Sequence, residues 1–286
     1  MLVRAFARCG VSKIRLTGGE PLLRRNIADL IGRLRRIDGV DDLALTTNAL
    51  LLPRHAGDLA AAGLDRINVS LDALDGAVFR RMSGGRGRVE RVLKGIDAAV
   101  EAGLRVKVNM VVEKGENEHE IVPMARYFKE RRLTLRFIEF MDVGNVNRWE
   151  MKKVYPARQI LTDLGAVGEL QPVTPAYTGE VAKRYRYTDT GTEVGIISSV
   201  TQPFCRDCSR ARLSADGKLY TCLFASTGFD LRSALRGEAP EEEPLNDDEL
   251  HALIVDIWSN RTDRYSELRT ELLKKHLHPQ KVEMSY

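Results

Sequence analysis

Three cysteines in the C-terminal third of the chain could bind a metal ion or an iron–sulfur cluster. Cys205, Cys208 and Cys222 lie in the segment FCRDCSRARLSADGKLYTCLF, and only Cys9 lies elsewhere. Structural zinc is almost always closed by four protein ligands, and neither Cys9 nor any histidine has the spacing of a zinc ribbon. A [4Fe-4S] cluster held by three thiolates keeps one iron open for another ligand. We therefore favour such a cluster, with a zinc-stabilised structural protein as the alternative.

Two arginines accompany these cysteines. Arg210 and Arg212 alternate with Ala211, so we expect both guanidinium groups on the same face of the first strand of a hairpin. Asp216-Gly217 supplies the turn. Guanidinium groups are suited to phosphate or carboxylate, whereas two arginines alone are often a solvated surface. Beside an open iron site, they predict an anion site.

Short apolar runs alternate with helical segments in the first 145 residues, which predicts an α/β fold with a parallel sheet. The runs are KIRLTG (13–18), LALTTN (43–48), RINVSLD (66–72), RVKVNMVV (105–112) and LRFIEFM (135–141). Apolar residues from Val89 to Val100 recur at helical spacing and predict one intervening helix. The polar groups TGGEP, TTN, SLD and EFMD follow four of the runs. The carboxyl ends of parallel strands form the edge that holds ligands, so these groups outline a site.

The pattern changes after about residue 145. A strand-like EVGIISSV, the cysteine hairpin, the acidic segment RGEAPEEEPLNDDE and a helix over 247–258 are predicted there. We therefore predict two parts, a partial barrel over 1–145 and a smaller C-terminal module over 146–286.

The overall composition is that of a folded protein with a small-molecule ligand. The chain has 286 residues, of which 43% are hydrophobic and 29% charged. The 44 basic residues are interspersed with 40 acidic ones, so the charge pattern favours an anionic small molecule over nucleic acid. No apolar run approaches the ~20 residues that cross a bilayer, and the cysteine pattern fits a reducing compartment. We expect a cytoplasmic protein with neither membrane nor nucleic-acid partners.

Several segments together resemble one enzyme family. KIRLTGGEPLLRR, LTTN, NVSLD, VKVNMVV, RFIEFMDVG and the cysteine segment are similar to the GTP 3',8-cyclases, radical S-adenosyl-L-methionine (SAM) enzymes of molybdenum cofactor biosynthesis. The resemblance implies a partial (β/α)6 TIM-like radical SAM barrel that lacks its first strand. It also implies a C-terminal module that holds a [4Fe-4S] cluster and GTP.

The resemblance assigns binding roles residue by residue and assigns no catalytic side chain. The positions similar to SAM-binding ones are Gly18, Gly19, Glu20, Pro21, Ser70 and Met141. Those similar to GTP-binding ones are Arg15, Thr46, Lys107, Arg210, Ala211 and Arg212, with Lys13 and Arg136 as weaker candidates. The cluster ligands implied are Cys205, Cys208 and Cys222. Each has a plainer alternative, because strand charges are often solvated, Thr46 and Ser70 could cap helices, and methionine is usually core.

The reaction implied by the resemblance converts GTP to 3',8-cyclo-7,8-dihydro-GTP. A 5'-deoxyadenosyl radical made from SAM removes the hydrogen at C3' of GTP, and the C3' radical attacks C8 of guanine. The partners implied are GTP, a reducing system and the downstream cyclic pyranopterin monophosphate synthase; the sequence leaves a homodimer open.

One element of the family pattern is missing from the sequence. The family uses CxxxCxxC to ligate a second [4Fe-4S] cluster that cleaves SAM, and the chain contains no such motif. We expect an N-terminally truncated form that is inactive as written, and we expect Cys9 to be a small buried helix residue. The alternatives are a non-catalytic GTP and Fe-S binding module, or another radical SAM enzyme with an auxiliary cluster.

Overall fold

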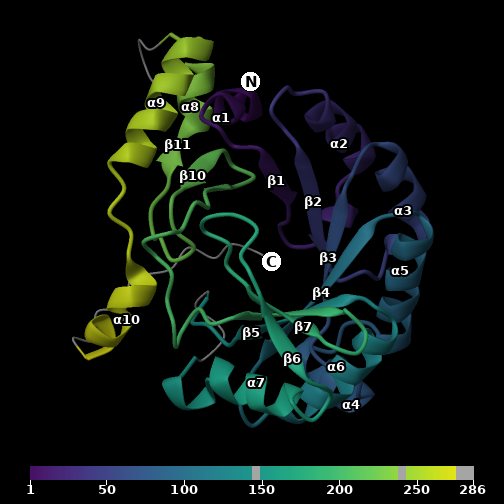
Figure 1. Cartoon of the computed structure of the whole chain (residues 1–286). Helices are drawn as coiled ribbons and strands as arrows, with labels where there is room; N and C mark the ends of the chain where they lie inside the picture. The colour runs from purple at the N-terminus through teal and green to yellow at the C-terminus, as the bar shows by residue number, and fades with distance from the viewer. Residues whose placement is uncertain (144–148, 238–242, 275–286) are drawn as a thin grey trace.

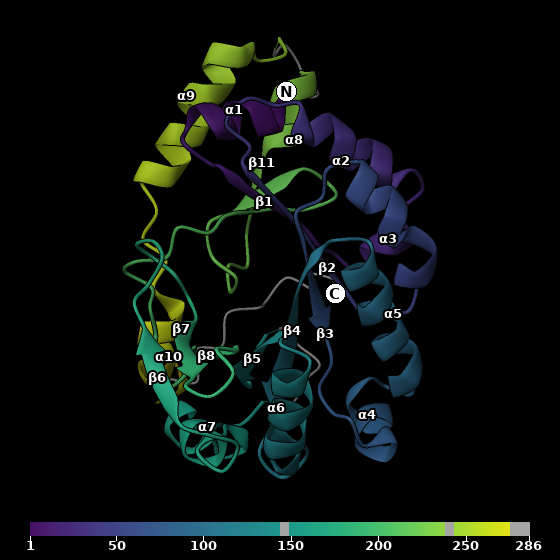
Figure 2. The ribbon, with the colours of Figure 1, turned by 45° about the vertical axis from the view of Figure 1, so that its right-hand side comes forward.

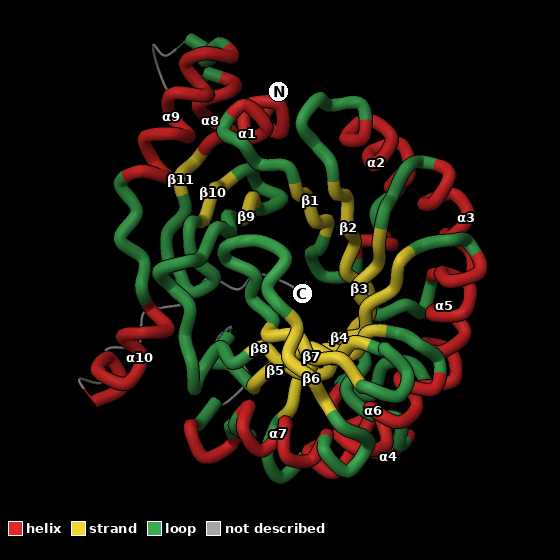
Figure 3. Tube along the Cα trace, in the orientation of Figure 1, coloured by secondary structure: helices red, strands yellow, loops and turns green. Residues whose placement is uncertain are grey.

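A curved eight-stranded sheet forms the centre of the computed structural model, which describes residues 1–143, 149–237 and 243–274. The strand order is β1-β2-β3-β4-β5-β8-β7-β6, and Figure 3 shows the strands gathered inside the arc of helices. The strands from β1 to β8 in this order are parallel. The parallel strands are β1 (Lys13–Leu16), β2 (Asp42–Thr47), β3 (Arg66–Ser70), β4 (Arg105–Val112), β5 (Thr134–Glu139) and β8 (Glu193–Ile197). The antiparallel strands are β7 (Lys183–Tyr187) and β6 (Leu170–Val173). Over the described residues the sheet is open, with β1 and β6 at its two ends.

The predicted α/β fold class is confirmed. The five apolar runs form β1 to β5, and EVGIISSV contains β8. Because β8 pairs in parallel with β5, the sheet continues across residue 145. The division into two parts at that residue stays a prediction, while β6 and β7 are strands that the sequence analysis does not predict.

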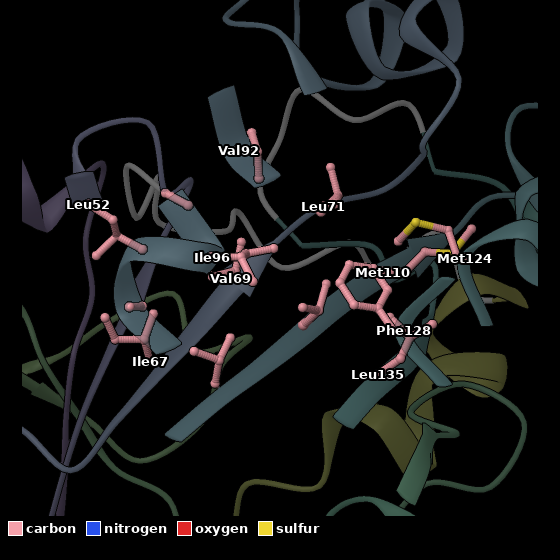
Figure 4. Packing of buried hydrophobic residues seen from close by; sticks show 14 of the residues in the cluster. Leu52, Ile67, Val69, Leu71, Val92, Ile96, Met110, Met124, Phe128 and Leu135 are labelled. Atoms are coloured by element: carbon pink, nitrogen blue, oxygen red, sulfur yellow. The ribbon is translucent and has the colours of Figure 1, made fainter. Parts of the chain in front are cut away.

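Helices cover the convex outer side of the parallel strands (Figures 1 and 2). They are α2 (Ile27–Arg35), α3 (Leu52–Ala61), α4 (Gly76–Met82), α5 (Val89–Glu101), α6 (Ile121–Glu130) and α7 (Ala157–Leu164), with short 3-10 turns η1 (Pro21–Leu23), η2 (Glu118–Glu120) and η3 (Met151–Lys153). The predicted helix over 89–100 is thus α5. Its apolar stripe joins the outward side chains of β3 and β4 in the main core, where Ile67, Val69, Ile96 and Met110 are fully buried (Figure 4).

The C-terminal segment packs against the N-terminal helix. It contains β9 (Arg212–Leu213), β10 (Lys218–Tyr220), β11 (Phe229–Asp230), α8 (Leu231–Arg236), α9 (Asp247–Ser259) and α10 (Tyr265–Lys274). The predicted hairpin is confirmed as β9 and β10, and the helix over 247–258 as α9. Helix α1 (Leu2–Arg8) packs on α9 (Figure 1), and Ala5 shares a second buried cluster with Leu250 and Ile254.

The expectation for Cys9 is wrong. Helix α1 ends at Arg8, and Cys9 is the exposed residue that follows. The apolar side of this short helix is supplied by Ala5, so the position four residues later already lies beyond the buried surface.

No helix among the described residues is long and apolar enough to cross a lipid bilayer.

Candidate functional site

Basic side chains line the inner face of the parallel sheet. Successive residues of a strand point to opposite faces, and Ile14 and Leu16 of β1 pack on the core beneath the helices. Lys13 and Arg15 therefore lie on the opposite, inner face. Lys107 has the same placement between two buried valines of β4. The inner face thus collects cations from separate strands.

The cations of this face lie close enough to repel one another. Desolvation by the surrounding protein, followed by the charges of Arg15 and Arg66, lowers the pKa of Arg136 to about 10. Desolvation also lowers the pKa of Arg15, and the next largest effects come from Arg210 and Arg66. Lys107 shows a lowered pKa as well, through desolvation and then Arg136 and Arg66. An anion bound among these groups would relieve their mutual repulsion.

Two asparagines orient Arg136 and are not among the predicted site residues. The Arg136 Nη2 group donates to Asn68 Oδ1 at 2.6 Å, and its Nε group donates to Asn109 Oδ1 at 2.8 Å. Both asparagines occupy inner-face positions of β3 and β4, as Arg66 does. Strand alternation, which places Asn68 between buried Ile67 and Val69, is the signal that could have found them.

Thr46 lies on the same face with an unused polar atom. Its Oγ1 is buried and has no hydrogen-bond partner among the described residues. It therefore does not cap a following helix; its neighbour Thr47 instead accepts the backbone N–H of Ala49 at 3.0 Å. A buried hydroxyl without a partner is costly, which favours a ligand contact.

The GGEP segment forms the rim next to this face. Gly18 and Gly19 are exposed after β1, and Pro21 begins the turn η1, in which Pro21 and Leu22 are buried. The Glu20 carboxylate accepts from Thr47 Oγ1 at 2.7 Å, from Asn48 N at 2.8 Å and from Leu22 N at 3.1 Å. Glu20 thus ties the end of β1 to the end of β2 and holds the exposed glycine backbone in place.

The two other predicted SAM contacts lie apart in the chain. Ser70 is exposed at the end of β3. Met141 follows β5 and lines a cavity that the cysteine segment also lines. Two residues after Ser70, Asp72 accepts the backbone N–H of Val111 at 2.8 Å. Burial raises the pKa of the Asp72 carboxyl to about 6.

The three predicted ligand cysteines meet at that one cavity. Its walls include Cys205, Cys208, Cys222, Arg210, Arg212 and Met141, together with Phe224, Arg261 and Asp263. Arg212 belongs to β9, whereas Arg210 precedes it, and both reach the cavity as the alternation predicts. Ala211 is exposed between them. Because Arg210 also affects Arg15, the cavity and the basic inner face are adjacent.

The thiols of this cavity differ in acidity. Burial acts to raise the pKa of Cys208, but the charge and hydrogen bonds of Arg210 outweigh it, so the pKa lies below its ordinary value. Burial raises the pKa of Cys222. The backbone N–H of Phe224, which donates to its Sγ at 3.4 Å, acts to lower this pKa but does not outweigh burial. Arginine beside Cys208 therefore favours a thiolate, the form in which cysteine binds metal.

No group of three or more His, Cys, Asp or Glu side chains in the described parts of the chain is arranged to hold a metal ion. A single ion needs its thiolates about 2.3 Å from one point, whereas a cluster distributes them over several irons. The donor type and the shared cavity fit an iron–sulfur cluster, and the ligand assignment stays a prediction.

Two known protein families match successive parts of the chain. The radical SAM superfamily matches residues 1–128, and the family described as Molybdenum Cofactor Synthesis C matches residues 133–267. The chain is 46% identical over 286 residues to proteins named GTP 3',8-cyclase from Staphylococcus haemolyticus and Staphylococcus aureus. It is covered completely in both alignments and spans 82% of each relative.

Solved structures support the fold. Streptococcus suis SuiB in its SAM-bound form has a TM-score of 0.59 at 16% identity, over 94% of this chain and 59% of the SuiB chain. Another SuiB structure has a TM-score of 0.58, and this chain spans 60% of its length. At this identity the likeness shows a shared fold.

Proposed function

Since this chain belongs to the GTP 3',8-cyclase family of radical SAM enzymes, we propose that its basic inner face binds GTP for conversion to 3',8-cyclo-7,8-dihydro-GTP. The observation that carries the proposal is the position of Arg15. It stands on the inner face of β1 and also within electrostatic reach of Arg210 beside the thiols. One elongated anionic ligand can therefore contact the sheet and the cysteine cavity together.

The charge distribution suggests how GTP is oriented. Arg15, Lys107 and Arg136 supply cations for the triphosphate, and Thr46 offers an unused hydroxyl. The three cysteines line the cavity beside this face, so we place the guanine edge there, with Arg210 and Arg212 directed toward the triphosphate of the same molecule. Holding both ends of GTP fixes C3' near C8, the two atoms that the reaction joins.

We propose that Cys205, Cys208 and Cys222 hold a [4Fe-4S] cluster with one iron open to the guanine edge. We assign SAM to the rim formed by Gly18, Gly19, Glu20 and Pro21, with Ser70 and Met141 completing its surroundings. When bound, SAM and a reducing cluster supply the radical that removes the C3' hydrogen. No residues are assigned to that second cluster, because the sequence contains no CxxxCxxC.

The absence of CxxxCxxC from this sequence favours a second candidate function for the chain on its own, which is GTP binding without turnover. A reducing system and the downstream cyclic pyranopterin monophosphate synthase are proposed partners of the complete reaction. The thiol-rich site fits a reducing compartment, and we place the protein in the cytoplasm.

Equilibrium dialysis and a cyclisation assay test these proposals separately. After anaerobic iron reconstitution, we expect one GTP and about four irons per chain. We expect Cys222→Ala to lose iron and Lys107→Met to lose GTP binding but retain iron. Arg33→Met is the control, because Arg33 is exposed on α2 of the outer layer. GTP binding that is unchanged in Lys107→Met would contradict the proposed site, and cyclisation with added SAM would contradict binding without turnover.

A further inference from the structure

Tyr177 is brought to the basic inner face by the bridging loop, which we define as residues 174–182 between β6 and β7. The Lys13 ammonium lies 3.3 Å from the centroid of its ring. Tyr177 also acts electrostatically on Arg15 and Arg136, raising the pKa of each against larger opposing effects. Its phenol group therefore lies near cations of both β1 and β5. Even so, 47% of the residue remains exposed.

Arg184 of β7 anchors the bridging loop at both ends. Its Nη2 group donates to the backbone oxygen of Thr174 at 2.9 Å, and its Nε group lies 3.0 Å from Glu180 Oε1. The second oxygen of Glu180 accepts the backbone N–H of Ala176 at 2.7 Å. These bonds hold the residues on either side of Tyr177, so its position is fixed by the fold.

The far end of the loop contacts the cysteine segment. Gly179 has a φ of +82°, and a Cβ there would lie 2.6 Å from the backbone oxygen of Asp207. Asp207 lies between Cys205 and Cys208. Only glycine allows this approach, so the loop bridges the basic face and the cysteine cavity.

A half-exposed tyrosine on an anchored loop gains little from packing. Tyr177 lies beside Lys13 and within electrostatic reach of Arg15 and Arg136, where the proposed triphosphate would lie. A phenol O–H is a good donor to phosphate oxygen, and hydrogen bonds to charged groups are the strong ones. The ring over Lys13 would at the same time limit the access of water to the ammonium group, which strengthens its attraction for phosphate.

We propose that Tyr177 is a further nucleotide-binding residue: its hydroxyl donates a hydrogen bond to the triphosphate, and its ring covers Lys13. The inference rests on the proposed function and names an additional contact of the same site. The bridging loop is then the element that fixes the phosphate end of the ligand relative to the cysteine cavity.

Binding of three probes tests this contact: GTP, inorganic tripolyphosphate and guanosine. We expect Tyr177→Phe, which removes only the hydroxyl, to weaken GTP and tripolyphosphate about tenfold, equivalent to ~1.4 kcal/mol. Tyr177→Leu also removes the ring and should weaken both further, while guanosine binding stays unchanged. Tyr127→Phe is the matched control, since Tyr127 lies on helix α6 of the outer layer. Thermal unfolding of each variant checks that the fold is intact.

The outcomes separate this contact from the proposed function. Tyr177→Phe and Tyr177→Leu proteins that bind tripolyphosphate as tightly as the parent overturn the role of Tyr177 alone. If the parent protein binds tripolyphosphate but not GTP, GTP is overturned as the ligand. Weaker tripolyphosphate binding by Tyr177→Phe would in that case still support the phosphate contact of Tyr177. A parent that binds neither probe overturns both.

Discussion

Arg269 of helix α10 is buried against Asp142, which follows strand β5. Its Nε and Nη2 groups each lie 2.9 Å from Asp142 Oδ1. The Tyr265 hydroxyl donates to the other carboxylate oxygen at 2.5 Å, and the Tyr265 ring stacks on Phe224 with centroids 4.5 Å apart. The Arg269–Asp142 pair therefore joins the C-terminal helix α10 to the end of β5. Because Phe224 lines the cysteine cavity, the stacking of Tyr265 on it joins the same helix to the candidate cluster site.

We expect Arg269→Met to destabilise the protein by about 3–5 kcal/mol. The substitution leaves the Asp142 carboxylate buried without its cation, and breaking one partner of a buried pair has costs of that order. Urea unfolding measures the change. Arg8→Met is the control, because Arg8 pairs with the largely exposed Asp248, and exposed pairs contribute roughly 0–1 kcal/mol. Equal losses in the two variants would contradict a structural role for the buried pair.

Gly95 of α5 is expected to tolerate no side chain. A Cβ there would lie 2.1 Å from the backbone oxygen of Ala49, in the loop after β2. Ala49 already has a φ of +65°, and its N–H donates to Thr47 Oγ1 at the end of β2, so a shift of this loop would disturb that bond. We expect Gly95→Ala to cost at least about 1–3 kcal/mol, as overpacking does. The unfolding midpoint in urea reports it.

Gly57 of α3 provides the matched comparison. It also lies within an outer helix, but a Cβ there meets nothing within 4 Å. Alanine in an open helical position is more favourable than glycine by roughly 0.5–1 kcal/mol, so Gly57→Ala should stabilise the protein. If Gly95→Ala lowers the free energy of unfolding and Gly57→Ala raises it, the close approach at Gly95 outweighs the helix propensity of alanine. Changes of the same sign in the two variants would contradict this explanation.

Local patterns explain which parts of the fold the sequence predicts. In the strands β1 to β5, apolar residues alternate with polar ones or form a continuous run, and α5 carries a regular apolar stripe. Each of these elements can therefore be predicted from its own segment of the sequence. The place of β8 beside β5 and of α1 against α9 depends on contacts between segments far apart in the chain. Nothing in the local sequence specifies those pairings. The exposure of Cys9 is mispredicted because α1 ends at Arg8, one residue before it.

The candidate site divides in the same way. Motif residues such as Arg15 and Lys107 are predictable from the family resemblance, and their inner-face placement follows from strand alternation. Asn68 opens the segment NVSLD, but the resemblance assigns it no role. It contributes to the site through one hydrogen bond to Arg136, sixty-eight residues away. Tyr177 reaches the site through a loop whose anchor, Arg184, is itself only visible in three dimensions.

The raised pKa of Asp72 predicts that stability falls as pH rises from about 4 to 6. Burial raises this pKa from 3.8 to about 6, against the smaller effect of the Val111 hydrogen bond. Between these values the folded state binds more protons than the unfolded state, so the free energy of unfolding decreases with pH. At 1.36 kcal/mol per pKa unit the loss is at most about 3 kcal/mol, and partial exposure of Asp72 reduces it.

Asp72→Asn removes this titration and can still accept from Val111. We expect the variant to lack that part of the decline and to be more stable than the parent above about pH 6. Urea unfolding of both proteins at several pH values gives the difference, in which other titrating groups cancel. A difference that does not change with pH would contradict the assignment.

Asn68→Asp should weaken GTP binding while preserving the geometry of the site. The new carboxylate has the same shape and accepts the same bond from Arg136 Nη2, which Asn68 Oδ1 now accepts at 2.6 Å. It also adds one negative charge among the cations that repel one another on the inner face. At an effective dielectric constant of about 20, such a charge 5–10 Å from phosphate costs roughly 2–3 kcal/mol.

Isothermal calorimetry compares GTP, GDP and guanosine on the Asn68→Asp protein. We expect the loss to decrease from GTP to GDP and to vanish for guanosine, because the effect acts on phosphate charge. Asn246→Asp adds the same charge at the N-terminal cap of α9, where aspartate caps as well as asparagine, and it should bind GTP as the parent does. An equal loss for guanosine would show that the substitution distorts the site, and the basic inner face would then not be the phosphate-binding surface.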